Sequence, residues 1–148
     1  MKIAFCLSGQ PRFIKECFET YYKPLIFDGN DIDVFMHTWE PDKDQVGQAY
    51  ENAGGHRIGK PVEEDVIKQY LDIYKPIKYH IEPQRPFQKE KYPGRTMFGI
   101  RSEFLFSMFY SIWKANELKK DYEIEKGFKY DWVIRARSDV QLKDKPNF

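Results

Sequence analysis

The sequence lacks a strong net charge, a cysteine framework and any long apolar run. Lys and Arg together number 24 and Asp and Glu 23, so the net charge at pH 7 is +1. Such a balance gives no general field for holding a polyanion, and we expect no nucleic acid as the main partner. An anionic ligand would have to be bound by a local cluster of basic side chains.

The scarcity of cysteines and apolar runs restricts the compartment. The two cysteines, Cys6 and Cys17, have no zinc-type spacing and fall among apolar residues, so we expect both to be small core residues. The N-terminal apolar run IAFCL is too short for a signal-peptide core, and no later run is long enough to cross a membrane. We therefore expect a soluble, cytoplasmic protein with no transmembrane segment.

Aromatic residues are abundant, at 17% of the chain. This content is far above that of a disordered chain, and 148 residues are enough to bury a core. No internal repeat or linker divides the sequence. We expect residues 1–148 to form a single domain.

Hydrophobic periodicity predicts strands that alternate with helices. Four strands are predicted, at Ile3–Leu7, Asp33–Thr38, Ile77–Ile81 and Asp131–Arg137. Three helices are predicted: from Pro11, with Phe13, Ile14, Cys17, Phe18 and Tyr21 inward; from Pro61 to Pro76; and over Met97–Lys120, with Phe104, Leu105, Met108, Phe109, Ile112 and Ala115 inward. The polar stretches Glu40–Lys60 and Glu82–Arg95 are expected to be loops.

This alternation predicts an α/β fold. The expected architecture is a three-layer α/β/α domain with a mostly parallel sheet in the Rossmann-like order 3-2-1-4. Strands 1 and 4 are then neighbours, and ligands bind at the carboxyl ends of strands at such a switch point. The segments at these two ends are SGQPR, residues 8–12, and RARSD, residues 135–139. We expect them to converge on one site.

SGQPR contains several groups that suit a phosphate. Ser8 offers a hydroxyl, Gly9 a close backbone approach, Gln10 an amide and Arg12 a guanidinium, all at the start of a predicted helix. A simple helix cap, with Arg12 on the surface, has the same pattern.

RARSD ends in a carboxylate at the end of a strand. Asp139 there suits a hard cation, because Mg²⁺ and Mn²⁺ use one or two carboxylates with phosphate oxygens and water. Arg135 and Arg137 point to one face by alternation, and either can neutralise Asp139, since a buried arginine needs a partner. The alternatives are that Asp139 is a surface turn residue or that the chain is the front portion of a larger protein.

Three other residues are candidates for the site. His37 and Trp39 close the second strand; a lone histidine there is more often structural, and Trp39 suits packing on a base or on the first helix. Arg101 falls on the inward stripe of the long helix and either pairs with Glu103 or faces the cleft. No Ser-His-Asp set, Walker loop or GxGxxG motif is recognisable.

Four segments together resemble a known family: IAFCLSGQPR, DVFMHTW, SMFYSIWKANELK and YDWVIRARSDV. They resemble the N-terminal portion of glycosyltransferases from bacteria, phages and large viruses that have a GT-A-like nucleotide-diphospho-sugar transferase fold. The segments follow the family's order and cover nearly the whole chain. The resemblance implies a nucleotide-sugar donor, a saccharide or other hydroxyl acceptor, and hexose transfer in carbohydrate biosynthesis. The acceptor half of such enzymes would lie beyond these residues.

The resemblance also implies roles for single residues. Asp139 matches the last carboxylate of the family's acidic motif, which holds Mn²⁺ or Mg²⁺, and Arg137 stands where the first acid would be, so metal dependence stays open. Both are the catalytic candidates, and Arg101 and Arg135 are further candidates for the donor.

The family's donor contacts match two other segments. Ser8, Gln10 and Arg12 match the loop that contacts the nucleotide and its diphosphate, with Gly9 between them. His37 and Trp39 match the end of the second strand, near the base.

Two other functions are open. One is a non-catalytic nucleotide- or glycan-binding module, and the exposed edge of the fourth strand favours a homodimer. The other is a doubly wound signalling-type domain. It is less favoured because the first strand ends without an acidic cluster.

Overall fold

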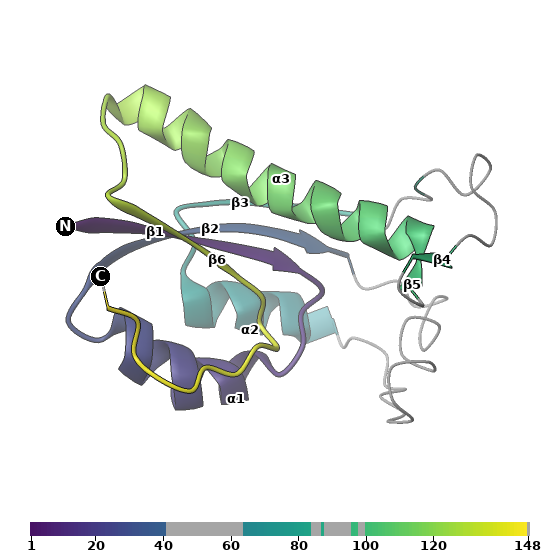
Figure 1. Ribbon diagram of the computed structural model, residues 1–148, viewed down its shortest axis with the longest axis horizontal. Coiled ribbons are helices and arrows are strands. Elements are labelled where there is room, and N and C mark those ends of the chain that lie inside the picture. Colours follow the sequence, from purple (N-terminus) through teal and green to yellow (C-terminus); the bar gives the residue numbers. More distant parts are fainter. Residues whose placement is uncertain (41–63, 84–86, 88–95, 98–99, 148) are drawn as a thin grey trace.

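A computed structural model describes residues 1–40, 64–83, 87, 96–97 and 100–147, without the side chains of 64–65, 96–97 and 100–104 (Figure 1). The strands are β1 (Lys2–Gly9), β2 (Asp31–Trp39), β3 (Lys78–Glu82), β4 (Thr96–Met97), β5 (Ile100–Arg101) and β6 (Trp132–Ala136). The helices are α1 (Ile14–Cys17), which continues as the π-helix η1 (Phe18–Phe27), α2 (Glu64–Tyr74) and α3 (Ser102–Lys126).

Four parallel strands form the main sheet, in the order β3-β2-β1-β6. This confirms the predicted strand order, because the fourth predicted strand lies beside the first. Residues 3–8 of the central strand β1 are all buried, which explains its continuous apolar run. All four predicted strands are present, although β6 ends at Ala136 and leaves Arg137 in the following turn.

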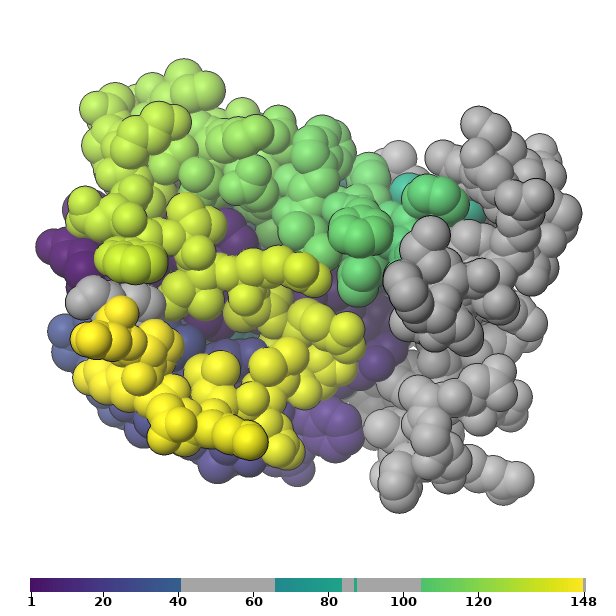
Figure 2. Space-filling view, viewed as in Figure 1, coloured from purple at the N-terminus to yellow at the C-terminus, as the bar shows by residue number. Residues whose placement is uncertain are grey.

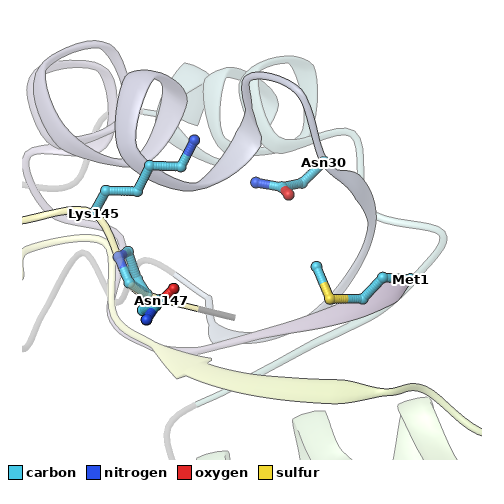
Figure 3. A pocket seen from close by; sticks show the side chains of 5 residues that line it. Met1, Asn30, Lys145 and Asn147 are labelled. Atoms are coloured by element: carbon cyan, nitrogen blue, oxygen red, sulfur yellow. The ribbon is translucent and has the colours of Figure 1, made fainter.

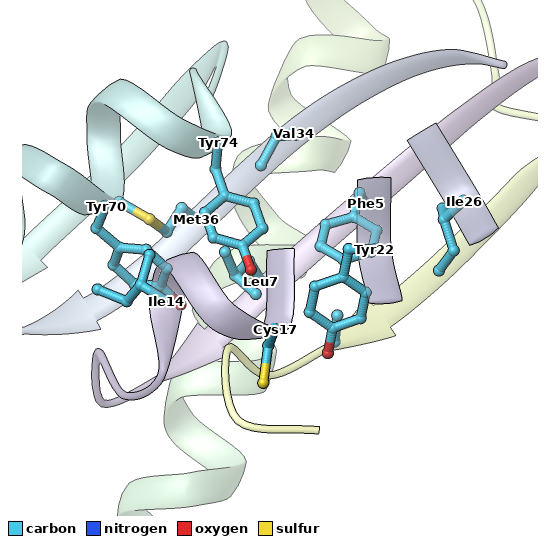
Figure 4. Close-up of a cluster of buried hydrophobic side chains, with 11 residues drawn as sticks. Phe5, Leu7, Ile14, Cys17, Tyr22, Ile26, Val34, Met36, Tyr70 and Tyr74 are labelled. Atoms are coloured by element: carbon cyan, nitrogen blue, oxygen red, sulfur yellow. The ribbon is translucent and has the colours of Figure 1, made fainter. Parts of the chain in front are cut away.

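Helices lie on both faces of this sheet (Figure 1). Alternation along β1 sends Phe5 and Leu7 toward α1 and α2, and sends Ala4 and Cys6 toward α3. The larger cluster, on the α1 side, is rich in aromatic rings that meet edge to face (Figure 4). Both cysteines are free and buried, as expected.

The first helix differs from its prediction. It begins at Ile14 rather than Pro11, and Phe13 has a left-handed backbone with φ 46° and is 50% exposed, so its predicted inward position is wrong. The widened π-helical turn bonds residues five apart, so Tyr22 is buried in the core five residues after Cys17, while Tyr21, predicted inward, packs against the core but is only partly buried. Pro24 lies inside η1. In a regular α-helix its ring would clash with the backbone carbonyl four residues earlier.

The long helix α3 packs on a stripe that shares Ala115 with the predicted one, and the side chain of Phe104, also predicted inward, lies outside the described residues. The buried residues among its described side chains follow a four-residue spacing and are small or polar: Ser107, Ser111, Ala115, Lys119 and Glu123. Phe109 is 59% exposed, which contradicts its predicted inward position. Small residues bring the helix close to the sheet, and the polar ones have partners that the periodicity does not reveal.

The long helix also has different ends from the prediction. It begins at Ser102, because Met97 belongs to β4, and it runs on to Lys126. Among the described residues, no helix combines the length and apolar character needed to cross a bilayer. Most of both predicted loops, and the predicted helix start at Pro61, lie outside the described residues.

Candidate functional site

β1 and β6 are neighbours and run in the same direction, so their carboxyl ends lie at one edge of the sheet (Figure 1). The crossover direction changes between them, which makes this edge the switch point at which such sheets bind ligands. Gly9 ends β1 with φ 107°, a backbone region that favours glycine. The chain then turns toward the segment that follows β6.

Two arginines meet one carboxylate at this edge. Arg137 binds Asp139 with both arms, Nε to Oδ1 at 2.9 Å and Nη2 to Oδ2 at 2.8 Å. The Arg12 Nη1 lies 3.6 Å from Oδ2 of the same carboxylate, and its Nη2 donates to Gln10 Oε1 at 2.9 Å. The Asp139 side chain is only 15% exposed, whereas that of Arg137 is 42% exposed. The side chains of Arg12, Arg137 and Asp139, called here the Arg-Asp-Arg cluster, leave one net positive charge facing the edge.

Both guanidinium groups stay charged at neutral pH. Burial lowers the pKa of Arg12 to about 10, although Asp139 opposes the shift. The hydrogen bonds from Arg137 to Asp139 raise the pKa of Arg137. The cluster is therefore a stable source of positive charge.

A buried hydroxyl joins the two segments. Ser138, 1% exposed, accepts a hydrogen bond from the Arg12 backbone N–H at 3.0 Å and donates one to the Gln10 carbonyl at 3.2 Å. The Tyr22 hydroxyl donates to the Arg137 carbonyl, and burial raises the pKa of Tyr22, so it keeps its proton. Neither Ser138 nor Tyr22 was predicted from the sequence as a site residue. The only sequence signal for Ser138 is its position between Arg137 and Asp139.

Gly9 is held from the other face of the sheet. Its N–H donates to Ser111 Oγ at 2.8 Å, and Ser111 Oγ lies 2.7 Å from His37 Nδ1. The opposite ring nitrogen, His37 Nε2, lies 3.0 Å from Glu82 Oε1. Burial lowers the pKa of His37, although Glu82 opposes the shift. A neutral ring that donates from Nε2 to Glu82 and accepts at Nδ1 from Ser111 satisfies this chain of groups.

This chain of groups resembles a catalytic triad, in which Ser111 would be the nucleophile, His37 the base and Glu82 the acid. Burial keeps a substrate from reaching them. Ser111 is 1% exposed and His37 is fully buried. The chain of groups, which sequence reasoning did not find, links α3, β2 and β3 to the end of β1. His37 thus contacts Gly9 through Ser111, and a structural role was one of the two alternatives given for it from the sequence.

The other predicted donor residues lie apart from the cluster. Trp39 is 3% exposed and packs against His37, with ring centroids 4.8 Å apart, and against Tyr110. Ser8 is buried on the α3 side of β1. Arg135 also points to that side, away from Asp139, into a groove beside α3. The side chain of Arg101 lies outside the described residues.

Two hollows lie elsewhere on the molecule. One, of about 450 Å³, is lined by Met1, Asn30 and Lys145 to Asn147 (Figure 3). It lies at the amino ends of the strands, since Lys2 pairs with Asp31 there, and so at the opposite end from the cluster. The other, of about 250 Å³, is the groove that contains Arg135.

The cluster does not fit a divalent cation. Both oxygens of Asp139 accept hydrogen bonds from Arg137, and Arg12 adds a second positive charge beside them. A cation would have to displace one guanidinium and stand beside the charge of the other. In the described part of the chain, no three His, Cys, Asp or Glu side chains gather as a metal site.

Comparison with known proteins gives no relative: no family model, curated protein or solved structure matches this chain.

Proposed function

We propose that the chain binds the diphosphate of a nucleotide-sugar at the Arg-Asp-Arg cluster. We further propose that it is a glycosyltransferase with a three-layer GT-A or Rossmann-like architecture, which transfers a hexose to a saccharide or other hydroxyl acceptor. One observation carries this proposal. Arg12 and Arg137, which come from opposite ends of the chain, meet at the carboxyl ends of the two switch-point strands.

The charge of the cluster supports an anionic ligand. The chain has a net charge of only +1, so binding of an anion depends on a local positive group such as this one. Asp139 takes the Nε and one Nη2 N–H of Arg137, which fixes the plane of the guanidinium. Its Nη1 and its second Nη2 N–H are left to donate to phosphate oxygens. The Gln10 amide beside Arg12 supplies a further polar group.

The same groups suit the chemistry of sugar transfer. As the bond from the sugar to the diphosphate breaks, negative charge grows on the leaving diphosphate, and fixed positive groups stabilise that charge. Arg12 and Arg137 provide such groups without a metal. Ser138 and the Ser111–His37–Glu82 chain hold the two loops, so little reorganisation is needed when the donor binds.

Calorimetric titration with UDP, GDP and their sugars, in buffer with EDTA, tests the proposal. We expect micromolar binding by wild type and binding about 10- to 100-fold weaker in Arg137→Ala, the range for losing hydrogen bonds to a charged group. Lys15→Ala is the matched control, because it removes an equal charge from a side chain that is 70% exposed and pairs with Glu19. If both variants bind equally well, the cluster is not the donor site.

Turnover then separates an enzyme from a binding module. An enzyme consumes the donor that binds most tightly, by hydrolysis or by transfer to an added saccharide. Tight binding with no turnover for any acceptor would favour the non-catalytic module.

A further inference from the structure

We propose that two copies of this chain associate through antiparallel pairing of β6 with β6 of a second copy. The pairing forms a continuous eight-stranded sheet. This inference does not depend on the proposed donor site.

β6 is an edge strand with an apolar and uncovered surface. It pairs with β1 on one side, and no described strand pairs with the other. Trp132 and Val133 are 48% and 47% exposed. In the space-filling view, β6 is a yellow-green band at the surface between α3 and the C-terminal segment (Figure 2). Edge strands are normally protected by charged side chains, proline or a bulge, and Trp132–Ala136 contains no proline and one charged residue, Arg135.

The apolar surface continues from the strand onto α3. The groove beside β6 is lined by Val133 and Arg135 from β6 and by Phe109 and Trp113 from α3, among others. Phe109 and Trp113 are 59% and 50% exposed. Contiguous exposed aromatic and aliphatic side chains of this kind mark protein interfaces.

The charges of β6 select a second copy of the same strand. Asp131, just before β6, is exposed, and its carboxylate accepts a hydrogen bond from the Lys2 backbone N–H at 2.7 Å. Arg135 is exposed and makes no hydrogen bond or ion pair with any described residue. An acid at one end of a strand and an arginine at the other are complementary to the same strand reversed.

In one register, every cross-strand pair of side chains between the two copies is favourable. If the two-fold axis passes beside Val133, each Val133 faces the other, and Asp131 of each copy faces Arg135 of the other. The remaining pair sets Trp132 against Ile134, both apolar. A shift of two residues, centred on Ile134, would set Val133 against Arg135 instead. Charge and polarity therefore favour the first register.

The other outer strand of the sheet, β3, does not offer the same pairing. β3 has Lys78 at its start and Glu82 at its end, but Lys78 is bound to Glu125 of α3 at 2.7 Å. Glu82 is 6% exposed and bound to His37. Both charged side chains of β3 thus bond a side chain of the same copy, whereas Arg135 of β6 bonds none of the described residues.

Charge reversal tests this register by sedimentation equilibrium. We expect the wild type to be a dimer. Asp131→Arg sets two arginine pairs across the axis and Arg135→Asp sets two aspartate pairs, so each variant alone should dissociate about 30-fold more easily. An equimolar mixture of the two variants should recover the dimer. In the mixed dimer the introduced arginine faces the introduced aspartate, and the native Arg135 of one variant faces the native Asp131 of the other.

The mixture also controls for folding, because a variant that had lost its fold could not restore the dimer. Circular dichroism of each variant alone provides a second check. A wild type that stays monomeric at hundreds of micromolar would overturn the proposal. So would single variants that dimerise as well as wild type, or a mixture that fails to recover the dimer.

Discussion

Asp139 is the residue on which the chemistry of the cluster depends. Its carboxylate places one negative charge between two guanidinium groups. As a metal ligand, it would be essential for donor binding. As the partner that orients Arg137, it lowers the positive potential felt by an anion while keeping the fork in place. The two roles predict opposite effects of removing its charge.

Asp139→Asn should therefore strengthen diphosphate binding about 3- to 10-fold in EDTA, because the amide oxygen still accepts from Arg137 and the negative charge is gone. Titration of UDP and GDP with and without Mn²⁺ measures this effect. Mn²⁺ should leave the wild-type affinity unchanged. If wild type requires Mn²⁺ and Asp139→Asn fails to bind, the carboxylate is a cation ligand as the acidic motif implies.

The end of α3 shows how a single helix can carry a buried charge. Glu123 is 3% exposed, and its carboxylate accepts hydrogen bonds from Lys119 at 3.0 Å, from Lys129 at 3.0 Å and from the Tyr130 N–H at 3.1 Å. Burial raises its pKa, but these three donors outweigh it and lower the pKa to about 2. The carboxylate ties α3 to the segment that enters β6.

This carboxylate should make stability depend on pH. Because its pKa is lowered from 4.5 to about 2 on folding, its contribution is full above pH 4.5 and is lost as the pH falls toward 2. Glu123→Gln should reduce the free energy of unfolding by about 3 kcal/mol at pH 7, and the difference from wild type should shrink between pH 4.5 and 2.

Urea unfolding at a series of pH values measures both effects. Glu117→Gln is the control on the same helix, because Glu117 forms a partly exposed pair with Lys120 and should cost less than about 1 kcal/mol. Equal losses in the two variants would contradict the role given to Glu123.

Over the whole molecule, the sequence predicts the helices, the strands and their order better than it predicts which side chains bond to one another. Strands β1 and β2 were predictable because each contains a continuous apolar run, and β3 and β6 because apolar and polar residues alternate along β3 and from Ile134 onward in β6, between turns. The π-helical η1 was not predictable from a spacing of 3.6 residues, and it buries Tyr22 in the core while Tyr21 packs there only partly buried.

The candidate site was predictable in position but not in detail. Convergence of the segments after β1 and β6 follows from strand order, so Arg12 and Asp139 could be placed together. His37 has partners 74 and 45 residues away, in Ser111 and Glu82, and no local pattern marks either. Arg135 alternates with Ala136 and so faces α3, whereas Arg137 lies in the turn and is able to reach Asp139.

The most direct test of the central claim is to locate the ligand by NMR. Backbone amide shifts of the ¹⁵N-labelled protein would be followed during titration with UDP, GDP and their sugars in EDTA. We predict that the largest shifts fall on Gly9, Gln10, Arg12, Ser138 and Asp139, the residues at the carboxyl ends of β1 and β6. Shifts centred instead on the groove of Trp113 and Arg135, or no shifts with any nucleotide, would contradict a donor site at the Arg-Asp-Arg cluster.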